Sequence, residues 1–307
     1  MSAMLQEIFY WLFNMSITAA ITGTVVLLIR RIPGLPKRLT VFLWLVPFLR
    51  MVVPLGLSSP FSLMSLLSRI TIKTVVVYQP AEDVSFSMIN SVMAADSYFP
   101  ITYKVNVLEQ VFRAASVLWI LVFSAILLVL AVLYTATLRE MKRARLLWDN
   151  IYLSEKVASP AVYGVVRPRI VLPASFADRD TELVLAHERM HIRRGDNFWR
   201  ILAFLTTAVH WFNPLAWVFL KQFLADLELS CDERVLVQLG QDRAKEYALT
   251  LLKSKESTAA FTSAFGGAKI WDRIENILSF KKMTRLSLIV FLVLIIAIFY
   301  CLLTNAG

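Results

Sequence analysis

The chain has 307 residues, a formal net charge of +10 and 58% hydrophobic residues, with a mean hydropathy of +0.63. Soluble domains are usually about 45–50% apolar, so this composition argues against a fully soluble protein and indicates that lipid surrounds much of the chain. Lys and Arg cluster at the edges of apolar segments. We therefore ascribe the positive charge to membrane topology and lipid headgroups, and expect no direct nucleic-acid partner.

Four apolar segments are each long enough, at about 18–22 residues, to cross a hydrocarbon core of about 30 Å. We expect four transmembrane helices, at 8–29, 39–57, 114–134 and 286–303. No basic stretch precedes the first segment and further spans follow it, so we interpret it as a retained anchor and not as a signal peptide. Cys301 falls in the last span and Cys231 in the more polar part before it, so buried thiols without a disulfide are expected.

Basic residues beside these segments predict the orientation of the chain in the membrane. The loop at 30–38, RRIPGLPKR, has four basic residues and no acid, so it is expected in the cytoplasm. The loop at 58–112 is nearly charge-balanced and is expected outside. Basic clusters follow the third span and precede the fourth, so the segment between these spans is expected in the cytoplasm. The predicted organisation is therefore a membrane part at 1–138, a cytoplasmic domain at 139–285 and a final span at 286–307.

The cytoplasmic part opens with residues that are typical of a small sheet. Over 150–173, β-branched and aromatic residues interrupted by proline and glycine predict short strands and tight turns. Apolar residues over 183–190 then recur at helical spacing, behind a helix cap at Asp178 or Asp180. The strand near 161–172 can offer its edge to an extended peptide, or it can be purely structural.

A further apolar stretch at 198–224 is almost long enough to span the membrane. A crossing there would place the residues before and after it in different compartments. Asn213 and Pro214 interrupt the stretch, and proline disfavours helical geometry in the residue before it. We therefore expect a helical hairpin that lies on or dips into the membrane, with a fifth crossing as the alternative.

Two of the three histidines of the chain lie one helical turn apart in LVLAHERMHIRRGD. His187 and His191 share one face of a helix by their i, i+4 spacing, so both imidazoles can bind one ion, and Glu188 completes the pattern HExxH. A zinc ion there would lower the pKa of a bound water toward about 7, and Glu188 would take the proton as general base. The alternative is a helix with two surface histidines and no metal.

A catalytic zinc also needs a third protein ligand and a group that orients the imidazoles. The extended motif HExxHxxGxxH is absent, because Arg194 and Asn197 stand at its glycine and third histidine. Glu228 and Asp232 form an ExxxD pair on one face of a predicted helix. We predict Glu228 as the third zinc ligand and Asp232 as the acceptor of a hydrogen bond from a ligating imidazole.

Other polar residues near these segments are open to two interpretations. Asp196 is either a capping or orienting group or part of a solvated turn. His210 is either a structural residue at a helix end or an aid to the transition state. Arg50, inside the second predicted span, either snorkels to the interface or pairs within the bundle. Asp226 and Glu233 are expected to be solvated.

These motifs together resemble a known family. The stretches SPAVYGVVRPRIVLP, LAHERMHIRRGDNFWR, WFNPLAW and DLELSCDERVL, with the spans, are similar to bacterial membrane zinc peptidases that regulate β-lactam resistance, the M56 (BlaR1/MecR1 antirepressor) family. The resemblance covers nearly the whole chain. It implies a mainly α-helical polytopic membrane protein with a cytoplasmic gluzincin-like α+β domain, in which His187, His191 and Glu228 bind zinc and Glu188 is the general base. It also implies regulated proteolysis of the chain itself and of a cytoplasmic repressor.

Sensor members of that family carry a penicillin-binding domain after the last span, whereas this sequence stops at Gly307. We therefore interpret the chain as a short member and expect a stimulus other than direct β-lactam acylation. The resemblance places self-cleavage within 274–282, at Ser279 and Phe280, with an ordinary amphipathic linker helix as the alternative. The expected partners are membrane lipids, a cytoplasmic protein substrate such as a transcriptional repressor, an unidentified sensor protein and, alternatively, a second copy of the chain in a homodimer.

The function that these patterns favour is a membrane zinc endopeptidase in signal transduction, which cuts itself or a cytoplasmic regulator by attack of a metal-activated water. Two other functions remain open. The first is a non-catalytic membrane receptor or scaffold that transmits a conformational change. The second is a membrane quality-control protease with many substrates.

Overall fold

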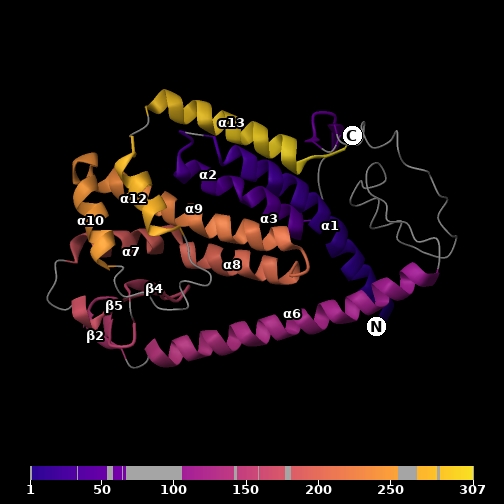
Figure 1. Cartoon of the computed structure of the whole chain (residues 1–307), viewed down its shortest axis with the longest axis horizontal. Coiled ribbons are helices and arrows are strands. Elements are labelled where there is room, and N and C mark those ends of the chain that lie inside the picture. Colours follow the sequence, from indigo (N-terminus) through magenta and orange to yellow (C-terminus); the bar gives the residue numbers. More distant parts are fainter. Residues whose placement is uncertain are drawn as a thin grey trace.

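The computed structural model is mainly α-helical and contains a small mixed sheet (Figure 1). The expected helix cap at Asp178 or Asp180 and most of the predicted outer loop lie outside the described part of the chain. The structure describes residues 2–32, 34–53, 58–63, 65–66, 106–141, 144–157, 159–176, 181–254, 268–281 and 284–306.

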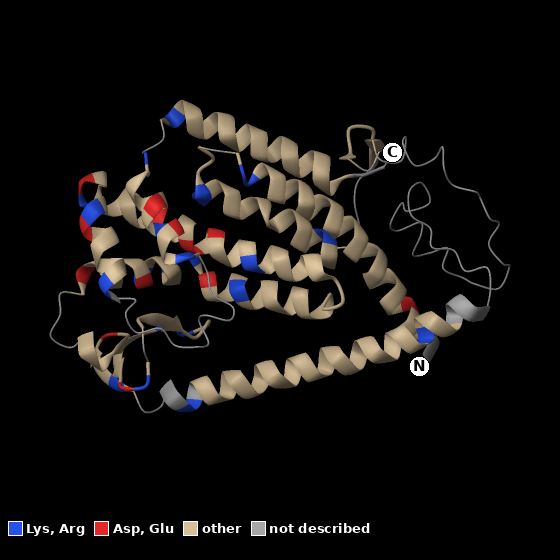
Figure 2. Cartoon of the chain, viewed as in Figure 1, with Lys and Arg blue, Asp and Glu red and all other residues tan. Residues whose placement is uncertain are grey.

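Three described helices are long and apolar enough to cross a membrane, which makes the chain a multi-pass membrane protein. They coincide with the first, third and fourth predicted spans. Charged residues gather around the ends of these helices and at one end of the molecule, whereas long stretches of α6 and α13 carry none (Figure 2). The three helices are α1 (Ser2–Ile29), α6 (Asn106–Met141) and α13 (Arg285–Leu303).

The second predicted span, at 39–57, forms two short helices among its described residues. They are α2 (Lys37–Leu43) and α3 (Leu45–Val52), which meet at Trp44. Pro47 has no N–H to donate to the carbonyl one turn earlier, so the helical hydrogen bonding is interrupted there. Neither helix alone is long enough to cross a membrane, so a crossing at 39–57, and with it the total of four spans, stays a prediction.

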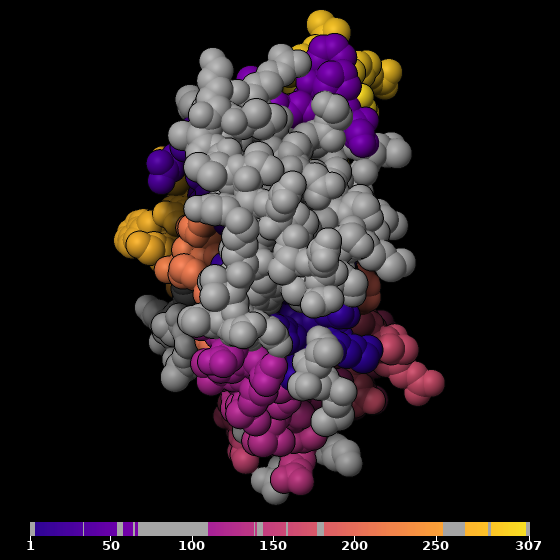
Figure 3. Space-filling view, turned by 90° about the vertical axis from the view of Figure 1, so that its right-hand side faces the viewer, coloured from indigo at the N-terminus to yellow at the C-terminus, as the bar shows by residue number. Residues whose placement is uncertain are grey.

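Of the two roles weighed for Arg50 on α3, the structure shows pairing within the bundle. Its side chain is buried and donates from Nε to the Leu302 carbonyl at 3.0 Å and from Nη2 to the Thr304 carbonyl at 2.6 Å. Carbonyls at a helix C-terminus lack intrahelical partners, so a cation is favourable there. At the same corner β1 (Ser58–Ser59) pairs in parallel with β6 (Asn305–Ala306), and residues near β1 (purple) adjoin the end of the chain (yellow) in Figure 3.

The stretch expected to form a hairpin does so. Helices α8 (Asp196–Val209) and α9 (Pro214–Leu239) run antiparallel and are joined by a short turn (Figure 1). The Asn213 side chain caps α9 by accepting from the Leu215 N–H at 2.9 Å, and Pro214 occupies the first turn, where its missing N–H costs nothing. The two sides of the hairpin therefore return to the same end of the molecule.

The tip of this hairpin lies among the spans. Asn213 Nδ2 donates to Ser16 Oγ at 2.7 Å, near the middle of α1, and Trp119 Nε1 of α6 donates to the Val209 carbonyl at 2.8 Å. His210, also at the tip, is fully buried and donates from Nε2 to the Met51 carbonyl at 3.0 Å. His210 is therefore a structural residue, and these contacts support the prediction that the hairpin dips into the membrane.

A four-stranded sheet supports the helix that carries the HExxH motif. Its inner residues pack against one face of α7 (Glu182–Arg194). The sheet has the strand order β2 (Arg145–Trp148), β3 (Ile151–Ser154), β5 (Arg169–Pro173), β4 (Ala161–Tyr163), and only the central β3–β5 pair is parallel. Three of these strands fall in the predicted segment. Strand β2 was not expected, because its residues directly follow the basic end of the third span.

Helix α9 packs against the membrane helices along its first half and against α7, α10 (Ala244–Ser254) and α12 (Ile270–Leu278) along its second half. Asp226 and Glu233 are consequently buried, and the expectation that they are solvated is wrong. Asp226 Oδ2 accepts from Arg30 Nε at 2.7 Å and Trp44 Nε1 at 2.8 Å. Glu233 accepts from the first two backbone N–H groups of α2 at 2.9 and 3.0 Å.

Gly23 lies where α1 approaches α9, and a Cβ there would stand 2.2 Å from the fully buried Phe219 ring. Gly23→Ala should therefore lower the free energy of unfolding by about 1–3 kcal/mol, measured by thermal unfolding in detergent micelles. Thr24→Ala, on the exposed side of the same helix, is the control. Phe219→Leu in the Gly23→Ala background should recover part of the loss, because the two sites touch. Unchanged stability of Gly23→Ala would contradict the close approach.

Candidate metal centre

Helix α7 presents His187, Glu188 and His191 as buried side chains, each 6–7% exposed. The helix ends at Gly195, whose left-handed backbone, with φ 64°, lets the chain turn directly into α8. This one-residue connection brings Asp196, the first residue of α8, beneath the second histidine. The local sequence thus sets both the spacing of the imidazoles and the position of one carboxylate.

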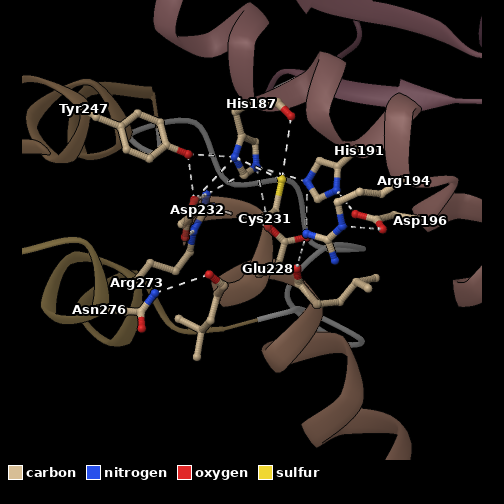
Figure 4. A network of polar contacts seen from close by, with 12 residues as sticks. His187, His191, Arg194, Asp196, Glu228, Cys231, Asp232, Tyr247, Arg273 and Asn276 are labelled. Atoms are coloured by element: carbon tan, nitrogen blue, oxygen red, sulfur yellow. Dashed lines mark hydrogen bonds and ion pairs between the residues drawn. The ribbon is translucent and has the colours of Figure 1, made fainter. Parts of the chain in front are cut away.

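The Nε2 atoms of the two histidines converge. His187 Nε2 and His191 Nε2 lie 3.0 Å apart (Figure 4). Glu228, on the facing side of α9, places Oε2 3.7 Å from the first Nε2 and Oε1 3.7 Å from the second. Two ligand atoms on one tetrahedral zinc stand about 3.4 Å apart, given bond lengths of about 2.0–2.1 Å. The residues predicted as ligands are therefore brought together at distances that fit zinc.

Each far ring nitrogen is held by an acceptor. Asp196 is 1% exposed and its Oδ2 lies 2.5 Å from His191 Nδ1, so this residue orients the imidazole and is not part of a solvated turn. Burial opposes a charge on His191, but Cys231, Glu228 and Asp196 outweigh it and raise its pKa to about 9. The negative groups that attract a proton to this ring would equally stabilise a metal cation.

Tyr247 of α10 connects the other histidine to Asp232. Its hydroxyl lies 2.7 Å from His187 Nδ1 and donates to Asp232 Oδ1 at 2.7 Å, while that oxygen is 3.4 Å from the same Nδ1. Because the hydroxyl proton goes to the carboxylate, the phenol oxygen accepts from Nδ1–H. His187 Nε2 then keeps its lone pair for the cluster. The role expected of Asp232, to accept directly from a ligating imidazole, stays a prediction, because the Tyr247 hydroxyl takes the shorter contact with Nδ1. Tyr247 belongs to no recognisable motif and was missed.

Cys231 is a second candidate for the third ligand. With His187 and His191 it forms a buried group whose ligand atoms all lie within 4.8 Å of one another. Burial raises the thiol pKa, but the two imidazoles outweigh this and lower it to about 7, which favours a thiolate. Its Sγ, however, lies 3.7 Å from His187 Nδ1, whereas Glu228 faces both Nε2 atoms. We therefore favour Glu228, although the cysteine one turn after it could have been suspected from the sequence.

Two arginines that the sequence did not single out neutralise the carboxylates. Arg273 of α12 forms a two-pronged pair with Asp232, Nε to Oδ2 at 2.8 Å and Nη2 to Oδ1 at 2.7 Å. Burial alone would raise the pKa of Asp232, but this guanidinium lowers it to about 2. Arg200 of α8 donates from Nη2 to Glu228 Oε1. Both carboxylates are thus held as anions in a buried place.

The remaining predicted site residues lie nearby without joining the cluster. Glu188 has no hydrogen-bond or ion-pair partner among the described residues, so no described cation holds its carboxylate. Ser279 is exposed at the end of α12, whereas Phe280 is 8% exposed and its carbonyl accepts from Gln241 Nε2 at 2.9 Å. Within the described ranges no polar contact joins either residue to the histidines, and self-cleavage between them stays a prediction.

The fold and the site together define a class of protein. It is a mainly helical, multi-pass membrane protein in which two buried imidazoles face a carboxylate. The family model described as BlaR1 peptidase M56 matches residues 10–289. The chain therefore belongs to this family, and that membership implies a metallopeptidase.

Two relatives match a smaller part of the chain. The regulatory protein BlaR1 of Bacillus licheniformis is 32% identical over 143 residues, which are 43% of this chain and 24% of the relative. The methicillin resistance mecR1 protein of Staphylococcus aureus strain Mu50 is 29% identical over 108 residues, or 34% of this chain and 18% of the relative. The match thus spans less than a quarter of either relative, so the activity of the whole relatives is not carried over.

Separate replacement of the two candidate ligands on α9 should identify the third ligand. Glu228→Ala should weaken zinc binding by more than the roughly 10–100-fold that loss of an outer partner causes, as His187→Ala should. Cys231→Ser should keep one zinc per chain. The zinc content of each purified full-length variant is measured by mass spectrometric metal analysis after dialysis against buffered zinc. The reverse outcome, with zinc kept by Glu228→Ala and lost by Cys231→Ser, would assign the ligand to the thiol.

Proposed function

We propose that this chain is a membrane-embedded zinc endopeptidase of regulated proteolysis, with His187, His191 and Glu228 as zinc ligands and Glu188 as general base. The observation that carries the proposal is the 3.0 Å approach of the two Nε2 atoms, with a carboxylate oxygen 3.7 Å from each. Two lone pairs at this distance repel each other unless a cation or a proton lies between them. A divalent metal satisfies both rings and the carboxylate together.

A zinc ion held by these residues would lower the pKa of a water ligand toward about 7 and polarise a peptide carbonyl. The protein supplies the rest of the chemistry. Glu188 accepts the proton of the attacking water and returns it to the leaving amine. Asp196 and the Tyr247–Asp232 pair hold the imidazoles in the required tautomer, and Arg200 holds Glu228 in place.

The proposed substrate is this chain itself or a cytoplasmic regulator such as a transcriptional repressor. The relatives are named as regulatory and methicillin resistance proteins, which supports a regulatory role. Strand β4 lies at an edge of the sheet and packs beside α7, so it can pair with an extended peptide. A bond in an extended, accessible segment is therefore favoured over one within a helix.

The site is proposed to face the cytoplasm. The loop at 30–38 is rich in basic residues, which favours the cytoplasmic side. Two contacts tie this region to the helix that carries Glu228, since Arg30 pairs with Asp226 at 2.7 Å and the start of α2 donates to Glu233. Whichever side of the membrane holds this loop therefore also holds the site.

Glu188→Gln should leave the zinc content unchanged and slow cleavage by about 10²–10⁴-fold, because only the proton acceptor is lost. The measurement is N-terminal sequencing and mass spectrometry of fragments in cells that produce the wild type, Glu188→Gln or the metal-ligand variant His187→Ala. One or two cleavage sites would support a switch, and many sites a quality-control protease. Fragments that persist with Glu188→Gln would defeat the assignment.

Reporter fusions test whether both helices of the site share a compartment. Green fluorescent protein joined after Ala186 and after Leu229 should fluoresce in both cases, and alkaline phosphatase at the same positions should stay inactive. This result is expected because α8 and α9 form a hairpin, so the chain returns to the side of the membrane from which it entered. Opposite behaviour of the two fusions would separate the ligands and remove the site.

A further inference from the structure

Arg273 brings a guanidinium to the centre of the candidate site, although 81 residues lie between it and His191, the last residue of the HExxH motif. Its Nη2 lies 3.3 Å from His187 Nε2, and its Nη1 lies 3.6 Å from Glu228 Oε2. Figure 4 shows this side chain beside Asp232 and extending toward the two proposed ligands. The side chain is 13% exposed, so it is not sealed from an incoming ligand.

The guanidinium is fixed in place before any substrate arrives. Asp232, which is fully buried, takes two of its five N–H donors in a two-pronged pair at 2.8 and 2.7 Å. The helix below it is also anchored, because Asn276 donates to the Leu229 carbonyl at 3.3 Å and Ile277 is buried against α9. A donor held in this way loses little freedom when it binds a developing charge.

Three N–H donors of Arg273 remain after the pairing with Asp232, and they belong to the two nitrogens nearest His187 and Glu228. A metal bound to these two residues would use the lone pairs that now face the guanidinium. The three N–H groups would then be available to another acceptor. A peptide carbonyl would be polarised beside His187 and Glu228. At that position its oxygen would lie within reach of these three N–H groups.

We propose that Arg273 is a further catalytic residue, which donates hydrogen bonds to the carbonyl oxygen of the bond that is cleaved. This rests on the proposed function and deepens it. The water oxygen bonds to the carbonyl carbon, and the C=O electron pair moves to the oxygen that Arg273 stabilises. Glu188 takes the water proton and passes it to the amide nitrogen as the C–N bond breaks. Arg273 stays protonated throughout.

Other polar groups of the described site are less suited to this role. The Tyr247 hydroxyl is already engaged by His187 and Asp232. Arg200 on α8 contacts Glu228, and among the described residues it makes no polar contact with either histidine. His210, weighed from the sequence as an aid to the transition state, lies at the hairpin tip against Met51. Arg273 alone among these contacts both a proposed histidine ligand and Glu228.

The test compares Arg273→Gln, Arg273→Lys and Arg273→Ala in the full chain in micelles, with Glu275→Gln, at an exposed position of the same helix, as the matched control. The assay follows the fragment that wild type forms and Glu188→Gln does not. Arg273→Gln should lower kcat by about 10²–10³-fold, as loss of one oxyanion donor does, and leave KM and zinc content nearly unchanged. Arg273→Lys should recover part of kcat. Added ethylguanidinium, but not ethylammonium, should partly restore Arg273→Ala.

Two results would overturn this role. If Arg273→Gln loses zinc in step with activity, the arginine acts only by positioning Asp232 and His187. If Arg273→Gln turns over like Glu275→Gln, the guanidinium does not contact the reacting groups. Failure of the proposed function is a different result, because wild type and Glu188→Gln would then be alike and both would contain zinc without forming the fragment.

Discussion

The structure depends most on the orientation of two imidazole rings. Each ring donates its Nδ1–H to a buried oxygen, of Asp196 for His191 and of Tyr247 for His187, so both Nε2 lone pairs point into one small space. A helical i, i+4 spacing brings the rings close, but it does not choose which nitrogen faces the partner. The outer acceptors make that choice, and they come from α8, α9 and α10. The candidate metal centre is therefore a property of four helices and not of the HExxH helix alone.

Helix α9 joins this centre to the membrane part. Its first half packs with the spans, its second half carries Glu228, Cys231 and Asp232, and Asp226 between them holds Arg30 and Trp44. An uninterrupted helix transmits displacement along its axis because its hydrogen bonds are continuous. A change in the packing of α1, α2 and α3 would therefore reach the Glu228 carboxylate directly. The proposed regulation of proteolysis would thus have a physical route that needs no flexible linker.

Charge balance explains why such a site can be buried at all. Asp196, Glu228 and Asp232 would each be costly to bury alone, and Arg194, Arg200 and Arg273 pair with them from somewhat more exposed positions. Arg273 lies on α12, which precedes the last span α13 in the chain.

Periodicity and motif spacing alone determined the membrane character, three of the spans, the hairpin, the strands at 150–173 and the grouping of His187, His191, Glu228 and Asp232 as candidate ligands and partners. The spans, the hairpin, the strands and the spacing within each motif are local features, since they depend on residues a few positions apart. The grouping of Glu228 with the two histidines instead followed from the need of a catalytic zinc for a third protein ligand. Only the tertiary structure decided the burial of Asp226 and Glu233, and the presence of Tyr247, Arg200 and Arg273 in the site. Those residues have no spacing in common and meet only because α7, α8, α9, α10 and α12 pack together, which no local pattern encodes.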